Sequence, residues 1–168
     1  MRAFFLCLAG LLLLSGCSNY RLGTGAELKF HTIYVAPLVN ESQAPQAVAI
    51  VSTQLREAFL RDARVILVNT PAEADVTLTV HLVRYFRDVE TRQSNDTGLA
   101  RKFDETFEAE ATLVDNRDKK VIFDKRKVQA VRQIFTDNGQ QLQAQYQNVP
   151  LLAETLAKNV VSATLDVW

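Results

Sequence analysis

The sequence predicts an α+β fold: a two-layer sandwich in which two helices pack on one face of a mixed, mostly antiparallel sheet of about four to five strands. Apolar residues recur every three or four positions over residues 46–61 and 150–166, the period of an amphipathic helix. Apolar and polar residues alternate over 76–82 and 101–114, the period of a half-buried strand. Such helices bury their stripes against the apolar face of a sheet.

The first predicted strand covers residues 31–40, which are rich in β-branched and aromatic residues. Pro37 has no N–H to donate to a ladder, so we expect it at an edge or at the end of the strand. The first helix follows over residues 46–61, and residues 65–68 should form a short buried strand. The predicted buried stripe of the helix consists of Val48, Val51, Leu55, Ala58 and Phe59.

The clearest alternation places the apolar residues of 76–82 on one face of a strand, and we expect this strand to continue toward Glu90. The polar residues 91–100 should form a loop. Because both helices should cover the apolar face, the opposite face should be wet or should contact a partner. That face carries Thr77, Thr79, His81, Glu108, Glu110 and Thr112.

Residues 101–132 predict a long hairpin around the polar turn 115–120, and residues 124–127 disturb its alternation in the manner of a bulge. Glu105 interrupts the apolar face near its start, and nothing in the sequence explains it. A turn is expected at Asp137-Asn138-Gly139. Pro150 is suited to the first turn of the C-terminal helix 150–166. The apolar stripe of that helix is Leu152, Leu156, Val160 and Leu165.

The N-terminus is typical of an export signal, with a positive charge at Arg2, an apolar run and small residues before Cys17. Leu14-Ser15-Gly16-Cys17 matches the lipobox, in which the cysteine thiol receives a diacylglyceryl group before cleavage. The apolar run of roughly 12 residues is shorter than the about 20 that span a bilayer. We therefore predict a signal peptide over 1–16, lipidation at Cys17, a lipidated linker over 17–30 and a single domain over 31–168.

Acylation with several chains, such as palmitate, would anchor the mature protein firmly, because a single chain gives only marginal binding. Ser18 follows the cysteine where bacterial lipoproteins retained in the inner membrane carry Asp. By resemblance to these lipoproteins, Ser18 indicates the outer membrane, on its periplasmic side.

Charge and cysteine content exclude several classes of function. The 19 basic and 19 acidic residues balance, so no global field attracts nucleic acid. Cys7 leaves with the signal and Cys17 carries lipid, so the mature domain has no thiol for a disulfide, a metal or catalysis. We find no phosphate-binding loop and no nucleophile elbow, and neither His31 nor His81 has partners at metal-ligand spacing. No enzyme, cofactor or metal site is therefore predicted.

Two basic clusters remain as candidate binding residues. We predict contact with an anionic lipid headgroup or a phosphate-rich ligand through Lys119 and Lys120 at the hairpin turn and through Lys125, Arg126 and Lys127 in the returning strand. A second cluster, Arg84, Arg87 and Arg92, ends the preceding strand. The alternative is that these cations only protect strand edges and keep the surface soluble.

Four segments resemble one known family. Tyr20-Arg21-Leu22 behind the lipobox is similar to the G-Y-x-L start of the LptE family of lipopolysaccharide-assembly lipoproteins, although Asn19 replaces the glycine. Residues 33–42, Leu55–Phe59 and Ala74–Leu78 are similar to its first strand and turn, its first helix and its "A-D-x-x-L" strand. No motif is matched after Leu82, so no binding residue can be transferred there.

The resemblance implies an outer-membrane lipoprotein that is not an enzyme. Such proteins act as plug and folding partner of the LptD β-barrel and help deliver lipopolysaccharide, with some direct lipopolysaccharide contact. The family fold, two helices on a four-stranded sheet, agrees with the pattern described above. The alternative is a periplasm-facing lipoprotein that activates a cell-envelope enzyme such as a peptidoglycan synthase.

Overall fold

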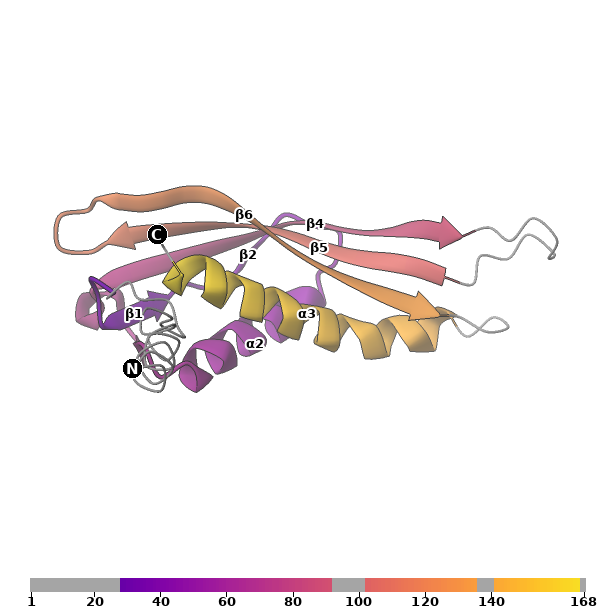
Figure 1. Ribbon diagram of the computed structural model, residues 1–168, viewed down its shortest axis with the longest axis horizontal. Coiled ribbons are helices and arrows are strands. Elements are labelled where there is room, and N and C mark those ends of the chain that lie inside the picture. Colours follow the sequence, from indigo (N-terminus) through magenta and orange to yellow (C-terminus); the bar gives the residue numbers. More distant parts are fainter. Residues whose placement is uncertain (1–27, 92–101, 136–140, 167–168) are drawn as a thin grey trace, which may run out of the picture.

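The computed structural model describes residues 28–91, 102–135 and 141–166. Cys17, the segment Tyr20-Arg21-Leu22, most of the predicted loop and the turn at Asp137-Asn138-Gly139 lie outside the described residues. The described elements are β1 (Thr32–Val35), β2 (Val39–Asn40), α2 (Ala47–Arg61), β3 (Ile66–Val68), the 3₁₀ turn η1 (Pro71–Glu73), β4 (Val76–Thr91), β5 (Lys102–Asp115), β6 (Val121–Phe135) and α3 (Gln141–Leu165) (Figure 1).

One sheet joins all the described strands in the order β3-β1-β4-β5-β6, and β2 also pairs with β4. β1 runs parallel to β3 and β4, and β2 runs parallel to β4. The long ladders between β4, β5 and β6 are antiparallel. The predicted mixed, mostly antiparallel α+β sandwich is confirmed, with six described strands in place of four to five.

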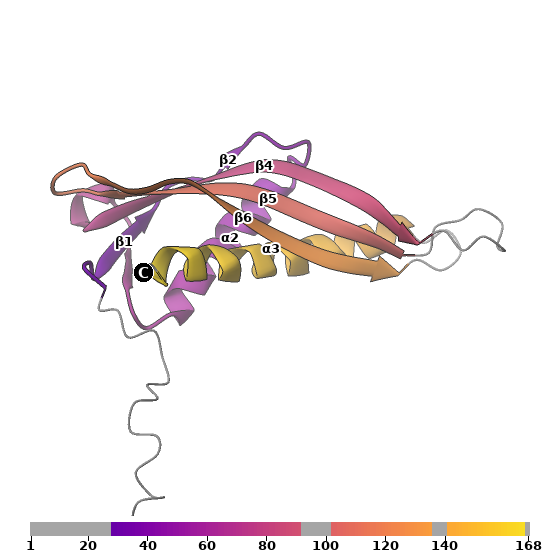
Figure 2. The same ribbon diagram turned by 45° about the horizontal axis from the view of Figure 1, so that its top comes forward.

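Both helices lie on one face of the sheet, as predicted (Figure 2). The side chains of β4 that face them, Val76, Leu78, Val80 and Leu82, are at most 1% exposed, and the intervening Thr77, Thr79 and His81 are partly exposed. Leu152, Leu156 and Val160 of α3 are fully buried above them. The helices and this face of the sheet therefore enclose the apolar core.

The buried residues of α2 are close to the predicted stripe. Val51, Leu55 and Phe59 are buried, and Ala47 takes the first buried position while Val48 and Ala58 are partly exposed. The helix ends at Arg61, and the backbone N–H of Asp62 donates to the carbonyl of Phe59.

Two predictions for the first strands need correction. The strand predicted over 31–40 is divided, because β1 ends at Val35 and Pro37 lies in the gap before β2. Pro37 therefore marks the end of a strand rather than an edge, since β1 is paired on both sides. The strand expected to be buried over 65–68 is β3 at the edge of the sheet, where Ile66 is 65% exposed while Val65 before it is buried.

The C-terminal helix also differs from the prediction. α3 begins at Gln141, and Pro150 lies inside it. A proline in a helix interior removes one backbone hydrogen bond and costs about 3 kcal/mol. Buried residues on both sides of the proline, Val149 and Leu152, hold the helix against the sheet, so packing overrides the local signal.

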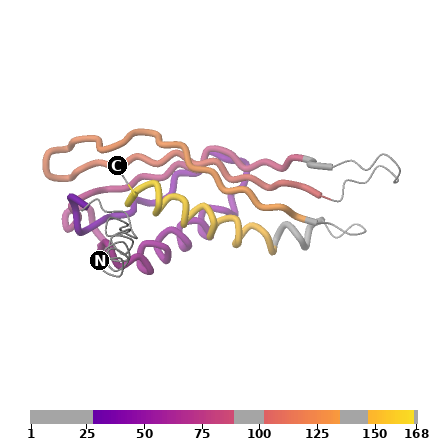
Figure 3. Tube along the Cα trace, viewed as in Figure 1, coloured from indigo at the N-terminus to yellow at the C-terminus, as the bar shows by residue number. Residues whose placement is uncertain are grey.

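The sheet is long, and its two ends carry different features (Figure 3). The β5–β6 turn, β1 and the end of α3 lie together at one end, which we call the proximal end. The end of β4, the start of β5, the end of β6 and the start of α3 lie at the other, the distal end. The lysines of the β5–β6 turn therefore lie at the proximal end, and Arg84 and Arg87 lie in the half of β4 nearer the distal end.

Candidate functional site

The β5–β6 turn at the proximal end is shaped by aspartate side chains that bond to nearby backbone. Asp115 Oδ1 accepts the N–H of Arg117 at 2.9 Å, and Asp118 Oδ1 accepts the N–H of Lys120 at 3.0 Å. The N–H of Asp115 donates to the carbonyl of Lys120 at 2.8 Å and closes the loop. Lys119 has a φ of 58°, the left-handed region that such tight turns require. The side chains of Lys119 and Lys120 are exposed.

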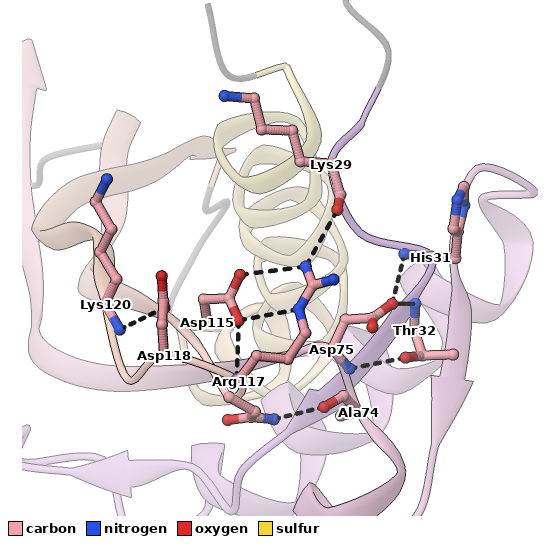
Figure 4. A network of polar contacts seen from close by, with 10 residues as sticks. Lys29, His31, Thr32, Ala74, Asp75, Asp115, Arg117, Asp118 and Lys120 are labelled. Atoms are coloured by element: carbon pink, nitrogen blue, oxygen red, sulfur yellow. Dashed lines mark hydrogen bonds and ion pairs between the residues drawn. The ribbon is translucent and has the colours of Figure 1, made fainter.

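This turn is attached to the start of the domain (Figure 4). Asn116 Nδ2 donates to the carbonyls of Ala74 and Pro71 at 2.9 and 3.1 Å, and the Asn116 N–H donates to the carbonyl of Asp75 at 2.8 Å. The guanidinium of Arg117 donates to the carbonyl of Lys29 at 3.4 Å. Residues that are far apart in sequence thus meet at the proximal end.

Asp75 is the centre of this attachment. Its Oδ2 accepts the N–H groups of His31 and Thr32 at 2.9 and 3.0 Å, and its own N–H donates to Thr32 Oγ1 at 2.8 Å. The bonds from His31 and then Thr32 lower the pKa of the Asp75 carboxyl, because they favour its charged form. The aspartate of the "A-D-x-x-L" segment therefore fixes the position of β1 beside β4.

Hydrogen bonds also lower the pKa of a carboxyl group in the β5–β6 turn. The N–H and then the guanidinium of Arg117 lower the pKa of Asp115, and Asp115 in turn raises the pKa of Arg117. Each carboxylate is thereby held ionised against backbone N–H groups or Arg117. The ammonium groups of Lys119 and Lys120 have no ion pair within the described parts of the chain.

A bulge interrupts the returning strand at the predicted cations, as the disturbed alternation suggested. The register of the β5–β6 ladder shifts between Ala111 and Leu113, and Lys125 has a φ of 45°. Thr112 Oγ1 donates to Asp124 Oδ1 at 3.0 Å and accepts the N–H of Lys125 at 3.1 Å. Lys125 and Lys127 are exposed, and Lys127 lies opposite Glu110 on the face away from the helices.

Arg126 is engaged within the fold. Its guanidinium lies 4.1 Å from the ring centroid of Phe123 and donates to the carbonyl of Ala163 in the last turn of α3. A cation at a helix C-terminus satisfies a free carbonyl and interacts favourably with the helix dipole. Four of the five predicted binding residues are therefore exposed lysines, two at the turn and two along the strand. The fifth, Arg126, is turned toward α3.

Two arginines of the second predicted cluster, Arg84 and Arg87, are paired with glutamates. Arg84 lies 3.6 Å from Glu108 and 4.5 Å from the ring centroid of Phe86. Arg87 bonds to Glu105 at 2.6 Å, and Arg92 lies outside the described residues.

The structure explains Glu105, the residue that breaks the apolar face of β5. Its side chain is fully buried. One carboxylate oxygen accepts bonds from the Tyr85 hydroxyl at 2.9 Å and Arg87 at 2.6 Å, and the other accepts a bond from Asn148 Nδ2 at 2.6 Å. Asn148 also accepts a bond from Arg132 Nε at 3.2 Å. This Glu105 network joins β4, β5, β6 and α3, and sequence spacing gives no signal of it.

The remaining polar candidates do not come together. His81 Nδ1 lies 3.0 Å from Glu41, and Glu108 is engaged by Arg84 and by Gln129 at 2.9 Å. Over residues 28–91, 102–135 and 141–166, no three metal-ligating side chains are grouped. In the same ranges, neither helix is both long and apolar enough to cross a bilayer.

The hollows on the described surface include arginines that are already engaged by other side chains. One of about 300 Å³ lies at the end of β1 and contains Arg56, which bonds to Asn69 at 3.1 Å. Another of about 270 Å³ lies between α2 and α3 and contains Arg64, paired with Asp62 and Asp166 at 2.8 and 2.7 Å.

Comparison with protein families gives one match, to the lipopolysaccharide-assembly family LptE over residues 30–164. No curated protein matches the chain. Among solved structures, the chain is similar to CT253 from Chlamydia trachomatis, with a TM-score of 0.54 and 9% identity over 80% of this chain and 95% of that chain.

It is also similar to lipoprotein B from Nitrosomonas europaea, with a TM-score of 0.52 and 19% identity over 88% of each chain. A third similar structure is XCC0632 from Xanthomonas campestris, with a TM-score of 0.53 and 12% identity over 83% of this chain and 85% of that chain. At these identities the structural similarities show the fold alone.

Proposed function

The chain belongs to the LptE lipopolysaccharide-assembly family, and on this basis we propose that it is an outer-membrane lipoprotein that assists delivery of lipopolysaccharide to the cell surface. The family match over residues 30–164 carries the proposal, because it covers nearly the whole folded domain. The lipobox at Leu14-Ser15-Gly16-Cys17 supports lipidation of Cys17 after removal of residues 1–16. The role proposed is assembly and not catalysis.

The partner we propose is the outer-membrane β-barrel LptD, for which this domain would serve as plug and folding partner. The surface available supports such a role. The sheet face away from the helices carries partly exposed polar side chains, Thr77, Thr79, His81, Glu110 and Thr112, and no described element covers it. A polar face of this kind can pair with polar side chains of a partner without burying unsatisfied groups.

Purification from detergent-solubilised outer membranes tests the partner and the anchor together. The wild-type lipoprotein should copurify with a large β-barrel, and Cys17→Ala should remain an unprocessed precursor without acyl chains. Copurification with an inner-membrane peptidoglycan synthase and no barrel would contradict the proposal and favour the alternative role.

We further propose that the basic hairpin, Lys119, Lys120, Lys125, Arg126 and Lys127, contacts lipopolysaccharide directly through its four lysines. Four of these cations are exposed lysines, and lipid A phosphates are multivalent anions to which several cations can bind together. Arg126 would act indirectly, by holding the hairpin against α3.

Titration of labelled lipopolysaccharide tests this contact. Lys119→Glu with Lys120→Glu should weaken binding by charge reversal, and binding to the wild type should fall as salt rises, because screening shortens the reach of exposed charges to about 8 Å at physiological ionic strength. Equal binding by both proteins would exclude the turn lysines as the site.

A further inference from the structure

Three cations gather at the proximal end without a described partner. Lys29, Lys119 and Lys120 are exposed, and no ion pair of their ammonium groups occurs in the described ranges. Figure 4 shows the side chains of Lys29 and Lys120 extending away from the polar network on the same side. The neighbouring carboxylates of Asp75 and Asp115 are turned inward to backbone N–H groups and Arg117. Asp118 in the turn is also exposed and accepts the N–H of Lys120, but the three lysines outnumber its single carboxylate, so these residues together carry a net positive charge.

Two exposed apolar side chains come directly after Lys119 and Lys120 in the sequence. Val121 and Ile122, the first residues of β6, are 50% and 38% exposed. Basic side chains beside exposed apolar ones are the combination by which protein segments bind at the interface of an anionic bilayer. We call Lys29, Lys119, Lys120, Val121 and Ile122 the proximal tip.

With the proposed lipid anchor at Cys17, the path of the chain would bring this tip near a membrane. Arg117 bonds to the carbonyl of Lys29, so the tip adjoins the point where the described chain begins at Leu28. Leu28 lies eleven positions after Cys17. A chain of that length reaches at most about 40 Å even when fully extended. An acylated Cys17 would hold the tip within that distance of the bilayer.

We propose that the proximal tip is a phospholipid-binding surface, which docks on anionic headgroups of the leaflet that holds the N-terminal acyl chains. This inference rests on the proposed lipidation of Cys17. The tether makes docking intramolecular, so weak contacts suffice to orient the domain. In the free lipoprotein, before it enters a barrel, the docked domain stands on its hairpin turn, with the distal end and the Glu105 network directed away from the membrane surface.

Fluorescence quenching in vesicles tests the orientation. After signal removal, Cys17 is the one cysteine of the sequence, so a second can carry a fluorophore. We place it at Asp118→Cys in the turn and, as a control, at Asp88→Cys near the distal end. In full lipoprotein on vesicles of phosphatidylethanolamine and phosphatidylglycerol, headgroup-spin-labelled lipid should quench the turn probe several-fold more than the distal probe. On phosphatidylcholine vesicles, or in high salt, the difference should disappear.

A matched pair of variants isolates the tip. Lys119→Gln with Lys120→Gln removes two charges at the turn, and Lys125→Gln with Lys127→Gln removes two charges from the same hairpin away from it. Each basic residue near an anionic surface contributes roughly fivefold to binding, so the turn pair should lower the docked-to-undocked ratio by about 25-fold. The strand pair should leave the ratio unchanged. Equal effects of the two pairs, or equal quenching of the two probes, would overturn the inference.

Three further outcomes separate this inference from the earlier proposals. Lipoprotein that fails to float with vesicles would lack the anchor, and both ideas would then be wrong. Protein that floats but has an unquenched turn probe would refute the docking alone. Quenching that requires lipopolysaccharide in the vesicles would also overturn phospholipid docking and would assign the tip to lipopolysaccharide.

Discussion

Replacing Glu105 by leucine should destabilise the domain far more than any other single change of a carboxylate in the described sheet. Glu105→Leu places an apolar side chain of similar size in a fully buried site, but it removes three accepted hydrogen bonds. Arg87 loses its ion pair, and the Tyr85 hydroxyl and the Asn148 amide lose this acceptor.

The magnitude follows from these losses. A hydrogen bond to a charged group contributes about 1.5–3 kcal/mol, and a buried donor left without its acceptor costs about 1–3 kcal/mol. The side chain of Arg87 is 26% exposed, so it can turn partly to water, and the full sum is not reached. Breaking one partner of a buried ion pair costs about 3–5 kcal/mol, which is the loss we expect.

Denaturant unfolding of the mature chain, made with Cys17→Ser, measures this loss. Glu110→Leu, on the partly exposed opposite face of the same strand, is the matched control and should change the free energy of unfolding by less than about 0.5 kcal/mol. Combined with Asn148→Leu, Glu105→Leu should show a coupling of about 0.5–3 kcal/mol, because the two side chains share a bond. Equal costs for the Glu105 and Glu110 variants would refute the reasoning.

Two further predictions test the core and the attachment at the proximal end. Leu78→Ala, at a fully buried position, should cost about 2–5 kcal/mol in denaturant unfolding, and Thr79→Ala on the opposite face should cost little; equal costs would mean that the faces are misassigned. Because hydrogen bonds from His31 and Thr32 lower the pKa of Asp75 in the folded state, its contribution to stability is present above its unfolded pKa of about 3.9 and is lost as the pH falls through the lower folded pKa. Asp75→Asn should therefore be less stable than wild type at neutral pH and lose less stability on acidification below about pH 4, and thermal melts at several pH values would reveal an unchanged acid slope if this is wrong.

The sequence predicts best where one local rule decides the structure. Period two placed Val76, Leu78, Val80 and Leu82 in the core, and the disturbed alternation at residues 124–127 located the bulge. Prediction failed where tertiary packing opposed a local signal. Pro150 favoured a helix start, but buried residues before it extend α3 to Gln141.

For the candidate site, too, local signals could be predicted and tertiary contacts could not. The turn lysines could be placed, because aspartates that bond to nearby backbone define a polar turn. The attachment of the turn to the start of the domain could not, since Arg117 and Lys29 are 88 positions apart. Arg126 was grouped with free cations because sequence shows charge and not whether a helix end lies beside it.

The bulge in β6 and the basic residues beside it protect an edge of the sheet. β6 is the long edge strand of an open sheet, and such an edge invites pairing with other chains unless it is distorted, charged or covered. All three devices occur here: Lys125 adopts a positive φ within the bulge, Lys127 is exposed beyond it, and Asn159 of α3 bonds to the edge carbonyl of Gln129 at 2.7 Å. Lys125 and Lys127 thus also protect the edge of the sheet, whereas Lys119 and Lys120 lie at the turn, beyond the ladder. Ligand binding should therefore depend more strongly on the turn lysines than on the strand lysines.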